Sequence, residues 1–490
     1  MKISIKKNHF NFLLTAILLH IFLSPTSIFG QKSTIKKIDE IVQAEAKYDL
    51  FSGTVLVAKE ARILYAKGIG EANKEYRISN ILETRFNVGS IEKCFVATLI
   101  LQLCQRGKLA LDDPLNQYFP GCPYATANQI QIKHLLNHTA GLGDYRRHED
   151  YKALSDTAQD IPEVLPLVFQ QEPEFEPGKE WKYSNTGYFL LKAIIEKITG
   201  KNFKQVLEQK ILNPLGMDDT VLFCKGDLLA QRASGYLYSD DGKHFIRATG
   251  EPAPYAGGGL YSTVMDLLAF DQALYSEELL TEESKKIMFT PVKPSRYYGY
   301  GWIVVPFGGG RAIYHGGSSD GFNAELRRYP EKRYTIILLS NYHGGSAFEL
   351  ANKIDSMLFD YPYLLATKYD LNFRLGMYSK NRNQDFKKAI EFFEKNLQDL
   401  QPHLPSLYES ASARLYGKFD QKRAIEMFDL YLKLAGEKAR PSKATVWARK
   451  GEAYEQLKET KTAIQCYKTS LKLDPKLEWV KKALERLEGK

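Results

Sequence analysis

The sequence predicts an α/β sandwich followed by an all-α segment of helical-hairpin repeats. Short apolar strands occur near both ends of the first 360 residues, and from about residue 371 small and aromatic side chains recur at a helical repeat period. At 490 residues the chain is too long for one ordinary domain, and its 44% hydrophobic content is enough for a sizeable core. We therefore predict two folded domains, at 31–360 and 371–490.

The helices and strands of the first domain are predicted from hydrophobic periodicity. A helix at 34–47 precedes two strands at 53–58 and 62–68. Near the end of the domain two strands and a closing helix are expected at 322–329, 334–340 and 347–358. Because turn residues at 330–332 separate the two apolar runs, these strands should form an antiparallel hairpin.

The first 30 residues have the composition of a secretory signal peptide. Lys2, Lys6 and Lys7 precede an apolar run at 12–23, and small residues follow up to Gly30. The run is short for a membrane span, so a retained anchor is the less favoured alternative. We predict cleavage near Gly30, a periplasmic or extracellular location, and no transmembrane span in the cleaved protein.

Ser90, with Lys93 three residues after it, is the strongest chemical signal in the first domain. A serine hydroxyl is a poor nucleophile until a base takes its proton, and a lysine one helical turn away can be that base. The apolar stretch 95–103 lacks Gly and Pro, which predicts a buried helix with Ser90 at its N-terminal end. A Ser-x-x-Lys pattern alone also fits a capping serine and a solvated lysine.

Two further motifs follow Ser90 in a fixed order. They are Tyr183-Ser184-Asn185 and His315-Gly316-Gly317, and around them stand Leu-Leu-Asn-His-Thr-Ala-Gly-Leu at 135–142, Phe-Glu-Pro-Gly at 175–178, Gly-Gly-Gly-Leu-Tyr-Ser-Thr at 257–263 and Tyr-Gly-Tyr-Gly-Trp at 298–302. Together they resemble the β-lactamase-related family of serine hydrolases, which contains class C β-lactamases, D-alanyl-D-alanine carboxypeptidases and related esterases. The resemblance covers about residues 35–358.

This resemblance implies a fold and a chemistry. The fold is a mainly antiparallel sheet flanked by helices, with an all-helical lobe at about 109–215. The chemistry is acyl transfer through an ester on Ser90, with the backbone amides of Ser90 and Ser318 binding the oxyanion. Gly317 and its neighbour would let the strand approach the substrate closely.

Lys93 and Tyr183 are the two candidate bases, and the sequence leaves their order open. Lys93 must be neutral part of the time to accept a proton. A phenol is protonated at neutral pH unless a nearby ammonium stabilises its phenolate. The resemblance assigns Asn185 to holding Lys93 and the carbonyl of the acyl group.

His315 departs from the β-lactamase pattern, in which a permanently charged lysine opens the third motif. A histidine near neutral pH is charged only part of the time. We therefore expect weak, pH-dependent anchoring of a substrate carboxylate, which favours a carboxypeptidase or esterase over an efficient β-lactamase. A structural histidine on an edge strand is the alternative.

No metal site and no cofactor are predicted. The five cysteines are scattered along the chain: Cys94, Cys104, Cys122, Cys224 and Cys466. They form neither a disulfide framework nor a zinc spacing. His134 and His138 are four residues apart but lack the intervening glutamate of a metalloprotease helix, so both are interpreted as structural.

The last 120 residues carry their own repeat. The run Trp-Ala-Arg-Lys-Gly-Glu-Ala-Tyr at 447–454, followed by Ala463 and Tyr467, resembles the tetratricopeptide repeat. Ala424 and Ala389 open weaker copies. We predict two to three helical hairpins closed by a charged helix at 477–487, with an ordinary helical extension as the alternative.

Charge and motifs together bound the function. The formal net charge is +9, and residues 371–490 hold 25 Lys and Arg against 16 Asp and Glu, interleaved in sign as on solvated helices. No nucleic-acid partner is expected. The sequence predicts a secreted serine hydrolase acting on an ester, amide or D-amino-acid peptide, with a possible protein partner on the repeats. The alternative is a catalytically weak sensor or scaffold whose repeats bind a protein.

Overall fold

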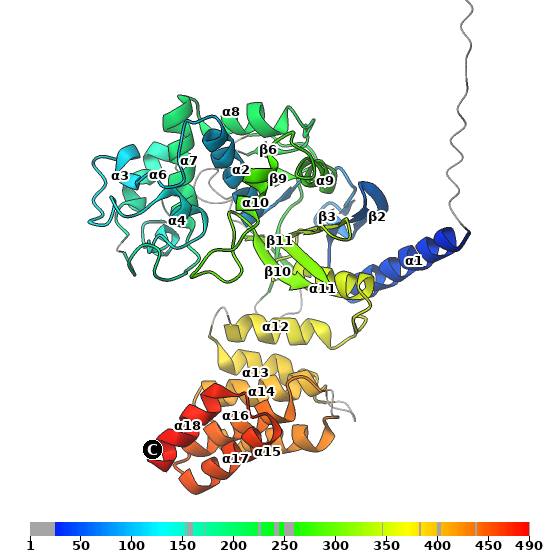
Figure 1. Cartoon of the computed structure of the whole chain (residues 1–490). Helices are drawn as coiled ribbons and strands as arrows, with labels where there is room; N and C mark the ends of the chain where they lie inside the picture. The colour runs from blue at the N-terminus through cyan, green and yellow to red at the C-terminus, as the bar shows by residue number, and fades with distance from the viewer. Residues whose placement is uncertain are drawn as a thin grey trace, which may run out of the picture.

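The computed structural model describes most of the chain from residue 25 to 489. The described residues leave out 1–24, 152, 154–159, 172, 224–226, 240–244, 249–258, 345, 382–383, 399–402, 437–438 and 490. Most of the predicted signal peptide, the first two glycines of the motif at 257–263, and Cys224 therefore lie outside the described residues. Figure 1 shows a sheet-containing part (25–358) and a helical part (370–489).

A six-stranded antiparallel sheet forms the centre of the sheet-containing part as described. Its strand order is β10-β11-β12-β13-β1-β2. The strands are β10 (Ile303–Phe307), β11 (Gly310–Ser319), β12 (Phe322–Tyr329), β13 (Tyr334–Ser340), β1 (Gly53–Lys59) and β2 (Arg62–Ile69). The predicted hairpin is confirmed at the predicted bounds, because β12 pairs with β13 from Asn323↔Ser340 to Tyr329↔Tyr334.

Helices cover both faces of this sheet. On one face α1 (Pro25–Lys47) and α11 (Ser346–Leu358) pack against apolar side chains of the strands, including Val55, Val57 and Leu338. α1 begins at Pro25 rather than at the predicted Thr34. The other face packs against α2 (Glu92–Gln105) and α9 (Val264–Ala273). β12 is buried along its whole length, which follows from this coverage on two sides.

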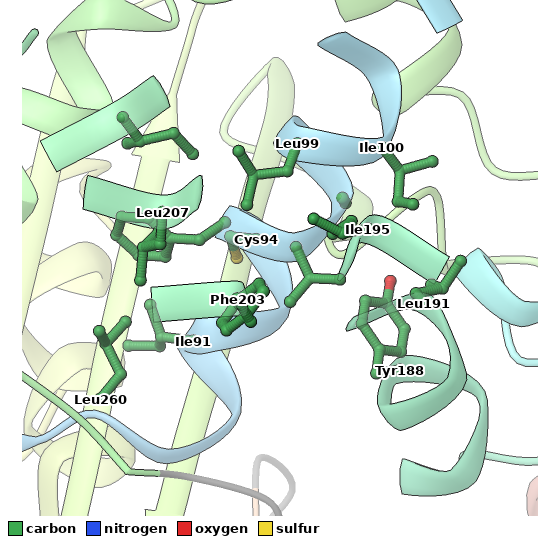
Figure 2. Close-up of a cluster of buried hydrophobic side chains, with 14 of the residues drawn as sticks. Ile91, Cys94, Leu99, Ile100, Tyr188, Leu191, Ile195, Phe203, Leu207 and Leu260 are labelled. Atoms are coloured by element: carbon green, nitrogen blue, oxygen red, sulfur yellow. The ribbon is translucent and has the colours of Figure 1, made fainter. Parts of the chain in front are cut away.

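The predicted helical lobe packs against α2. Its helices are α3 (Leu115–Tyr118), α4 (Ile132–Leu136), η2 (Tyr145–Arg147), α6 (Ile161–Val168), α7 (Asn185–Thr199), α8 (Phe203–Leu207) and η3 (Glu208–Leu212). Figure 2 shows Cys94 and Ile100 of α2 among side chains from α7 and α8, such as Ile195 and Phe203. α2 is therefore a buried helix between the sheet and the lobe, as its apolar sequence predicts.

Short strands and one helix complete this part. They are β3 (Glu71–Asn73) with β4 (Ile78–Ser79), β5 (Phe86–Asn87) with β9 (Leu260–Ser262) and β6 (Val221–Leu222), β7 (Tyr236–Tyr238) with β8 (Phe245–Arg247), and α10 (Glu282–Met288). β5 leads directly into η1 (Gly89–Ile91), which carries Ser90 at the start of α2. The small β5-β9-β6 sheet thus fixes the entry of the chain into the serine turn.

The helical part consists of antiparallel helix pairs. They are α12 (Asp370–Asn381) with α13 (Phe386–Lys395), α14 (Leu404–Tyr416) with α15 (Gln421–Leu434), α16 (Lys443–Gln456) with α17 (Thr460–Leu473), and a last helix α18 (Glu478–Glu488). Small residues sit where helices approach: a Cβ on Gly451 would lie 2.7 Å from the Tyr467 ring. The predicted hairpins and closing helix are therefore present.

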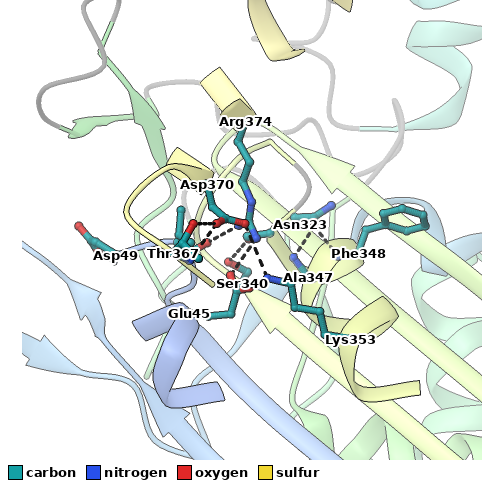
Figure 3. Close-up of polar contacts among 12 residues, drawn as sticks. Glu45, Asp49, Asn323, Ser340, Ala347, Phe348, Lys353, Thr367, Asp370 and Arg374 are labelled. Atoms are coloured by element: carbon teal, nitrogen blue, oxygen red, sulfur yellow. Dashed lines mark hydrogen bonds and ion pairs between the residues drawn. The ribbon is translucent and has the colours of Figure 1, made fainter. Parts of the chain in front are cut away.

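α12 docks the helical part onto the sheet-containing part. Arg374 of α12 donates to the carbonyl of Leu50 at 3.0 Å. It also forms an ion pair with Glu45 of α1, and Glu45 pairs in turn with Lys353 of α11 (Figure 3).

None of the described helices is both long and apolar enough for a membrane span.

Candidate active site

The backbone around Ser90 is shaped by a glycine and an asparagine. Gly89 has a φ of 52°, a conformation that side chains rarely adopt. Its N–H donates to Asn87 Oδ1 at 2.9 Å, and the same oxygen accepts a hydrogen bond from Ser319 Oγ at 3.0 Å. This turn places Ser90 at the N-terminal end of α2, where the sequence predicted it.

Three of the predicted site residues are connected to Ser90. Tyr183 and Lys93 contact its hydroxyl, and Asn185 contacts Lys93. Tyr183 OH lies 2.9 Å from Ser90 Oγ, and Lys93 Nζ lies 3.2 Å from the same oxygen. Lys93 also donates to Asn185 Oδ1 at 2.9 Å. Its side chain is buried, and its ammonium lies 5.1 Å from the centre of the Tyr183 ring. Ser90, Lys93, Tyr183 and Asn185 therefore form one hydrogen-bonded cluster.

Strand β11 passes directly beside the serine turn. A Cβ on Gly317 would lie 1.9 Å from the Val88 carbonyl oxygen and 3.2 Å from the Ser90 nitrogen. A Cβ on Gly89 would lie 2.7 Å from the Ser318 nitrogen. The two backbones can approach this closely only because both positions lack a side chain. The predicted oxyanion donors, the amides of Ser90 and Ser318, thus come from adjacent backbone segments.

His315 was expected to be charged part of the time near neutral pH, and the structure indicates a neutral ring instead. Burial, followed by the charge of Lys93, lowers the pKa of His315 to about 3, so the ring is neutral near neutral pH. Its Nε2 lies 2.9 Å from Tyr298 OH, and its Nδ1 lies 2.6 Å from the Gly316 carbonyl. The alternative was a structural histidine on an edge strand, and the edge position is wrong, because β11 lies between β10 and β12.

Sequence reasoning missed two residues that bond to predicted site residues. Asp144 accepts a hydrogen bond from Asn185 Nδ2 at 2.6 Å, and Tyr298 bonds to His315. Tyr298 stands in a motif that the sequence singled out, but its partner His315 lies on β11. Asp144 follows the motif at 135–142 by two residues, which is the only signal that could have found it.

The histidines at 134 and 138 bond to backbone amides. His134 Nδ1 accepts from Gln131 N at 3.2 Å, and His138 Nδ1 accepts from Ser184 N at 3.3 Å. The His138 ring lies 4.3 Å from that of Tyr183, and burial holds the pKa of His138 well below the usual value.

Within the part of the chain that the structure describes, no three potential metal ligands are grouped, and Cys94, Cys104, Cys122 and Cys466 are free thiols.

The cluster unites a hydroxyl, two groups able to exchange protons with it, and two neighbouring backbone amides. Residues 37–356 match the family model of the β-lactamases, and 444–477 match that of the tetratricopeptide repeat. The chain belongs to the β-lactamase family of serine hydrolases. Its last segment carries tetratricopeptide repeat sequence, as predicted.

Relatives of this β-lactamase-family hydrolase include a penicillin-binding protein and a teichoic acid D-alanine hydrolase. It is 31% identical over 352 residues to a penicillin-binding protein of Bacillus subtilis (strain 168), covering 67% of this chain and 77% of the relative. It is 26% identical over 328 residues to a teichoic acid D-alanine hydrolase of Staphylococcus aureus, covering 66% and 77%.

Solved structures confirm the fold. A penicillin-binding protein from Bacillus halodurans aligns with a TM-score of 0.58 at 28% identity, covering 65% of this chain and 98% of that one. A D-amino acid amidase from Ochrobactrum anthropi SV3 aligns with a TM-score of 0.57 at 24% identity, covering 67% and 97%. The β-lactamase fold therefore accounts for the sheet-containing part. The helical part is not included in that fold.

Proposed function

We propose that this protein is a secreted serine hydrolase that forms an acyl-enzyme on Ser90 and cleaves an ester, an amide or a D-amino-acid peptide. The observation that carries the proposal is the double contact at Ser90 Oγ, with Tyr183 OH at 2.9 Å and Lys93 Nζ at 3.2 Å. The hydrolase domain is assigned to 31–360 and the repeat domain to 371–490.

In the proposed reaction the Ser90 oxygen bonds to the substrate carbonyl carbon while its proton passes to Lys93 or Tyr183. The amides of Ser90 and Ser318 stabilise the oxyanion that forms. The bond to the leaving group then breaks, and the leaving group takes up the proton. A water molecule attacks the Ser90 ester, its proton passes to the same base, and Ser90 Oγ recovers a proton as the acid is released.

Among these substrates we favour those that lack a carboxylate beside the scissile bond. His315 is neutral and hydrogen-bonded on both ring nitrogens, so it offers no cation at the place where β-lactamases use a lysine. The relative named as a teichoic acid D-alanine hydrolase supports a D-alanyl ester as one candidate. We therefore favour D-aminoacyl esters and amides over penicillins and cephalosporins.

Secretion and a protein partner belong to the same proposal. The lysines and apolar run of the first 30 residues support export, and cell-wall relatives fit a location outside the cytoplasm. The tetratricopeptide repeat supports a protein partner on the helical part, because stacked helix pairs present extended binding surfaces.

A fluorophosphonate probe tests the nucleophile. The wild-type full chain should be labelled, Ser90→Ala should not, and Ser79→Ala, which changes an exposed serine of β4, should be labelled like the wild type. Absence of labelling in all three contradicts the proposal and supports the weak sensor or scaffold. Hydrolysis of a D-alanyl ester, a D-Ala-D-Ala peptide and a cephalosporin then ranks the substrates; a cephalosporin as the best substrate contradicts the assignment of His315.

A further inference from the structure

Asn185 is hydrogen-bonded at both ends of its side-chain amide. The orientation of that amide decides whether its oxygen or its NH2 group faces Lys93. Its Oδ1 accepts from Lys93 Nζ at 2.9 Å, and its Nδ2 donates to Asp144 Oδ2 at 2.6 Å. The two ends of an amide have nearly the same shape, so packing alone does not fix which end faces a neighbour. If the amide turned over, its NH2 group would face the lysine ammonium, and the hydrogen bond would be lost.

Asp144 removes this ambiguity because an ionised carboxylate accepts hydrogen bonds and cannot donate them. Burial alone would raise the pKa of Asp144, but the nearby Arg146 guanidinium and the bond from Asn185 hold it below the usual value. The carboxyl group is therefore ionised at neutral pH. Only the orientation with Nδ2 toward Asp144 makes a bond there, and that orientation directs Oδ1 to Lys93.

The fold holds Asp144 and Asn185 in register through bonds on both sides of the pair. The Gly143 carbonyl accepts from Thr186 Oγ1 at 2.5 Å and from Ser184 Oγ at 3.3 Å. The Tyr145 N–H donates to Thr186 Oγ1 at 3.0 Å. The residues before and after Asp144 are thus bonded to the residues before and after Asn185, and these bonds hold the two backbone segments together.

The intervening amide also separates the carboxylate from the lysine. A carboxylate in direct contact would stabilise the ammonium form and oppose its loss of a proton. A neutral amide positions the lysine without adding a charge next to it. This arrangement suits a group that has to exchange protons with Ser90.

We propose that Asp144 is a positioning residue for the acyl transfer: its carboxylate orients the Asn185 amide, and the amide oxygen holds Lys93 beside Ser90. The inference rests on the proposed function and adds a residue that acts only through Asn185.

Asp144→Asn is the decisive variant. Asp144 also caps η2 by accepting from Arg146 N at 3.1 Å, and asparagine caps as well as aspartate. The new amide offers both a donor and an acceptor, so Asn185 is free to turn over. We expect kcat for a neutral p-nitrophenyl ester to fall by about 10²-fold, because small misplacements of reacting groups cost that much, while KM stays within about threefold.

A double-mutant cycle separates positioning from a structural role. In an Asn185→Ala background, Asp144→Asn should cause no further loss of kcat, because its target is already gone. Asp144→Ser keeps a capping side chain but lacks the carboxylate, so it should show the same loss of kcat. This variant replaces Asp144→Asn in the test if Asp144→Asn does not fold cooperatively. Asp160→Asn, at the cap of α6, is the matched control and should retain wild-type kcat.

Two outcomes overturn the inference: wild-type kcat in folded Asp144→Asn, or an undiminished further loss in the Asn185→Ala background. Failure of the proposed function has a different signature, because wild type and Ser90→Ala would then hydrolyse the ester equally.

Discussion

Glu45 and Arg374 form an ion pair that joins the first helix of the hydrolase to the first helix of the repeats, with Arg374 Nη2 2.8 Å from Glu45 Oε2. The Glu45 side chain is fully buried, and Lys353 Nζ lies 2.6 Å from its other oxygen. Arg374 also donates to the Leu50 carbonyl. The repeat segment is therefore anchored through a buried charge, which couples its position to the stability of the hydrolase.

Arg374→Met should lower the free energy of unfolding by about 2 to 3 kcal/mol. Removing one partner of a buried pair leaves a charge without compensation, and the remaining Lys353 reduces that cost. Thermal or urea unfolding of the full chain measures the effect. Arg423→Met, which breaks an exposed pair with Glu426, is the control and should cost less than about 1 kcal/mol. Equal costs for the two variants would mean that Glu45 is not held by Arg374.

Gly317→Ala should abolish most of the hydrolysis. The added methyl group would lie 1.9 Å from the Val88 carbonyl, so β11 must move away from the serine turn and carry the Ser318 amide with it. We expect kcat to fall by about 10²-fold or more. Gly121→Ala is the control, since a Cβ there meets no atom within 4 Å. An active Gly317→Ala enzyme would show that Ser318 does not donate to the oxyanion.

Lys93→Arg should inactivate the enzyme although the positive charge is retained. An arginine stays protonated and cannot accept the Ser90 proton, whereas a group that only attracts anions would tolerate the change. We expect at least about 10²-fold loss of kcat on a neutral ester. Lys182→Arg, which alters the half-exposed partner of Glu174 next to Tyr183, should retain activity. Substantial turnover by Lys93→Arg would leave Tyr183 as the base.

His315 should make the protein less stable in mild acid. Its pKa is about 3 in the folded protein against 6.5 as the ordinary value, so between these pH values the unfolded chain binds the proton and the folded protein does not. Protons therefore favour unfolding, and stability falls as pH decreases through 6.5. One such group contributes about 2 kcal/mol between pH 7 and pH 5.

The variant His315→Gln should flatten this part of the pH dependence, measured as the free energy of unfolding at several pH values. The KM of a carboxylate-bearing substrate should also show no step between pH 5.5 and pH 8, because the neutral ring does not titrate there. A step near pH 6.5 that disappears in His315→Gln would restore the partly charged anchor expected from the sequence.

Part of this structure was predictable because local patterns agree with the final environment. The runs at 322–329 and 334–340 are apolar and separated by turn residues, and they form β12 and β13 at those bounds. Ser90, Lys93 and Tyr183 were found because family motifs stand in order around them. A strand was expected at His315 and Gly317 only from the family resemblance. The bounds of β11 were not predicted, since glycines at 316 and 317 weaken a strand pattern and pairing with β12 supplies what the sequence lacks.

The protonation of His315 and the role of Asp144 could not be read from the sequence. His315 is neutral because the fold buries its ring and places Lys93, from a distant part of the chain, near it. Asp144 lies in a loop, where aspartate is common for turns and caps, so its residue type alone carries no chemical signal. Both depend on distances that only the folded chain sets.

The order of strands has a consequence for synthesis on the ribosome. β1 pairs with β13 from Gly53↔Ser340 to Lys59↔Tyr334, so the N-terminal hairpin lacks its neighbour until about 270 further residues have been translated. Until then one edge of β1 is exposed and able to pair with another chain. A nascent polypeptide of this length and topology should therefore depend on chaperones that cover the unpaired edge of β1.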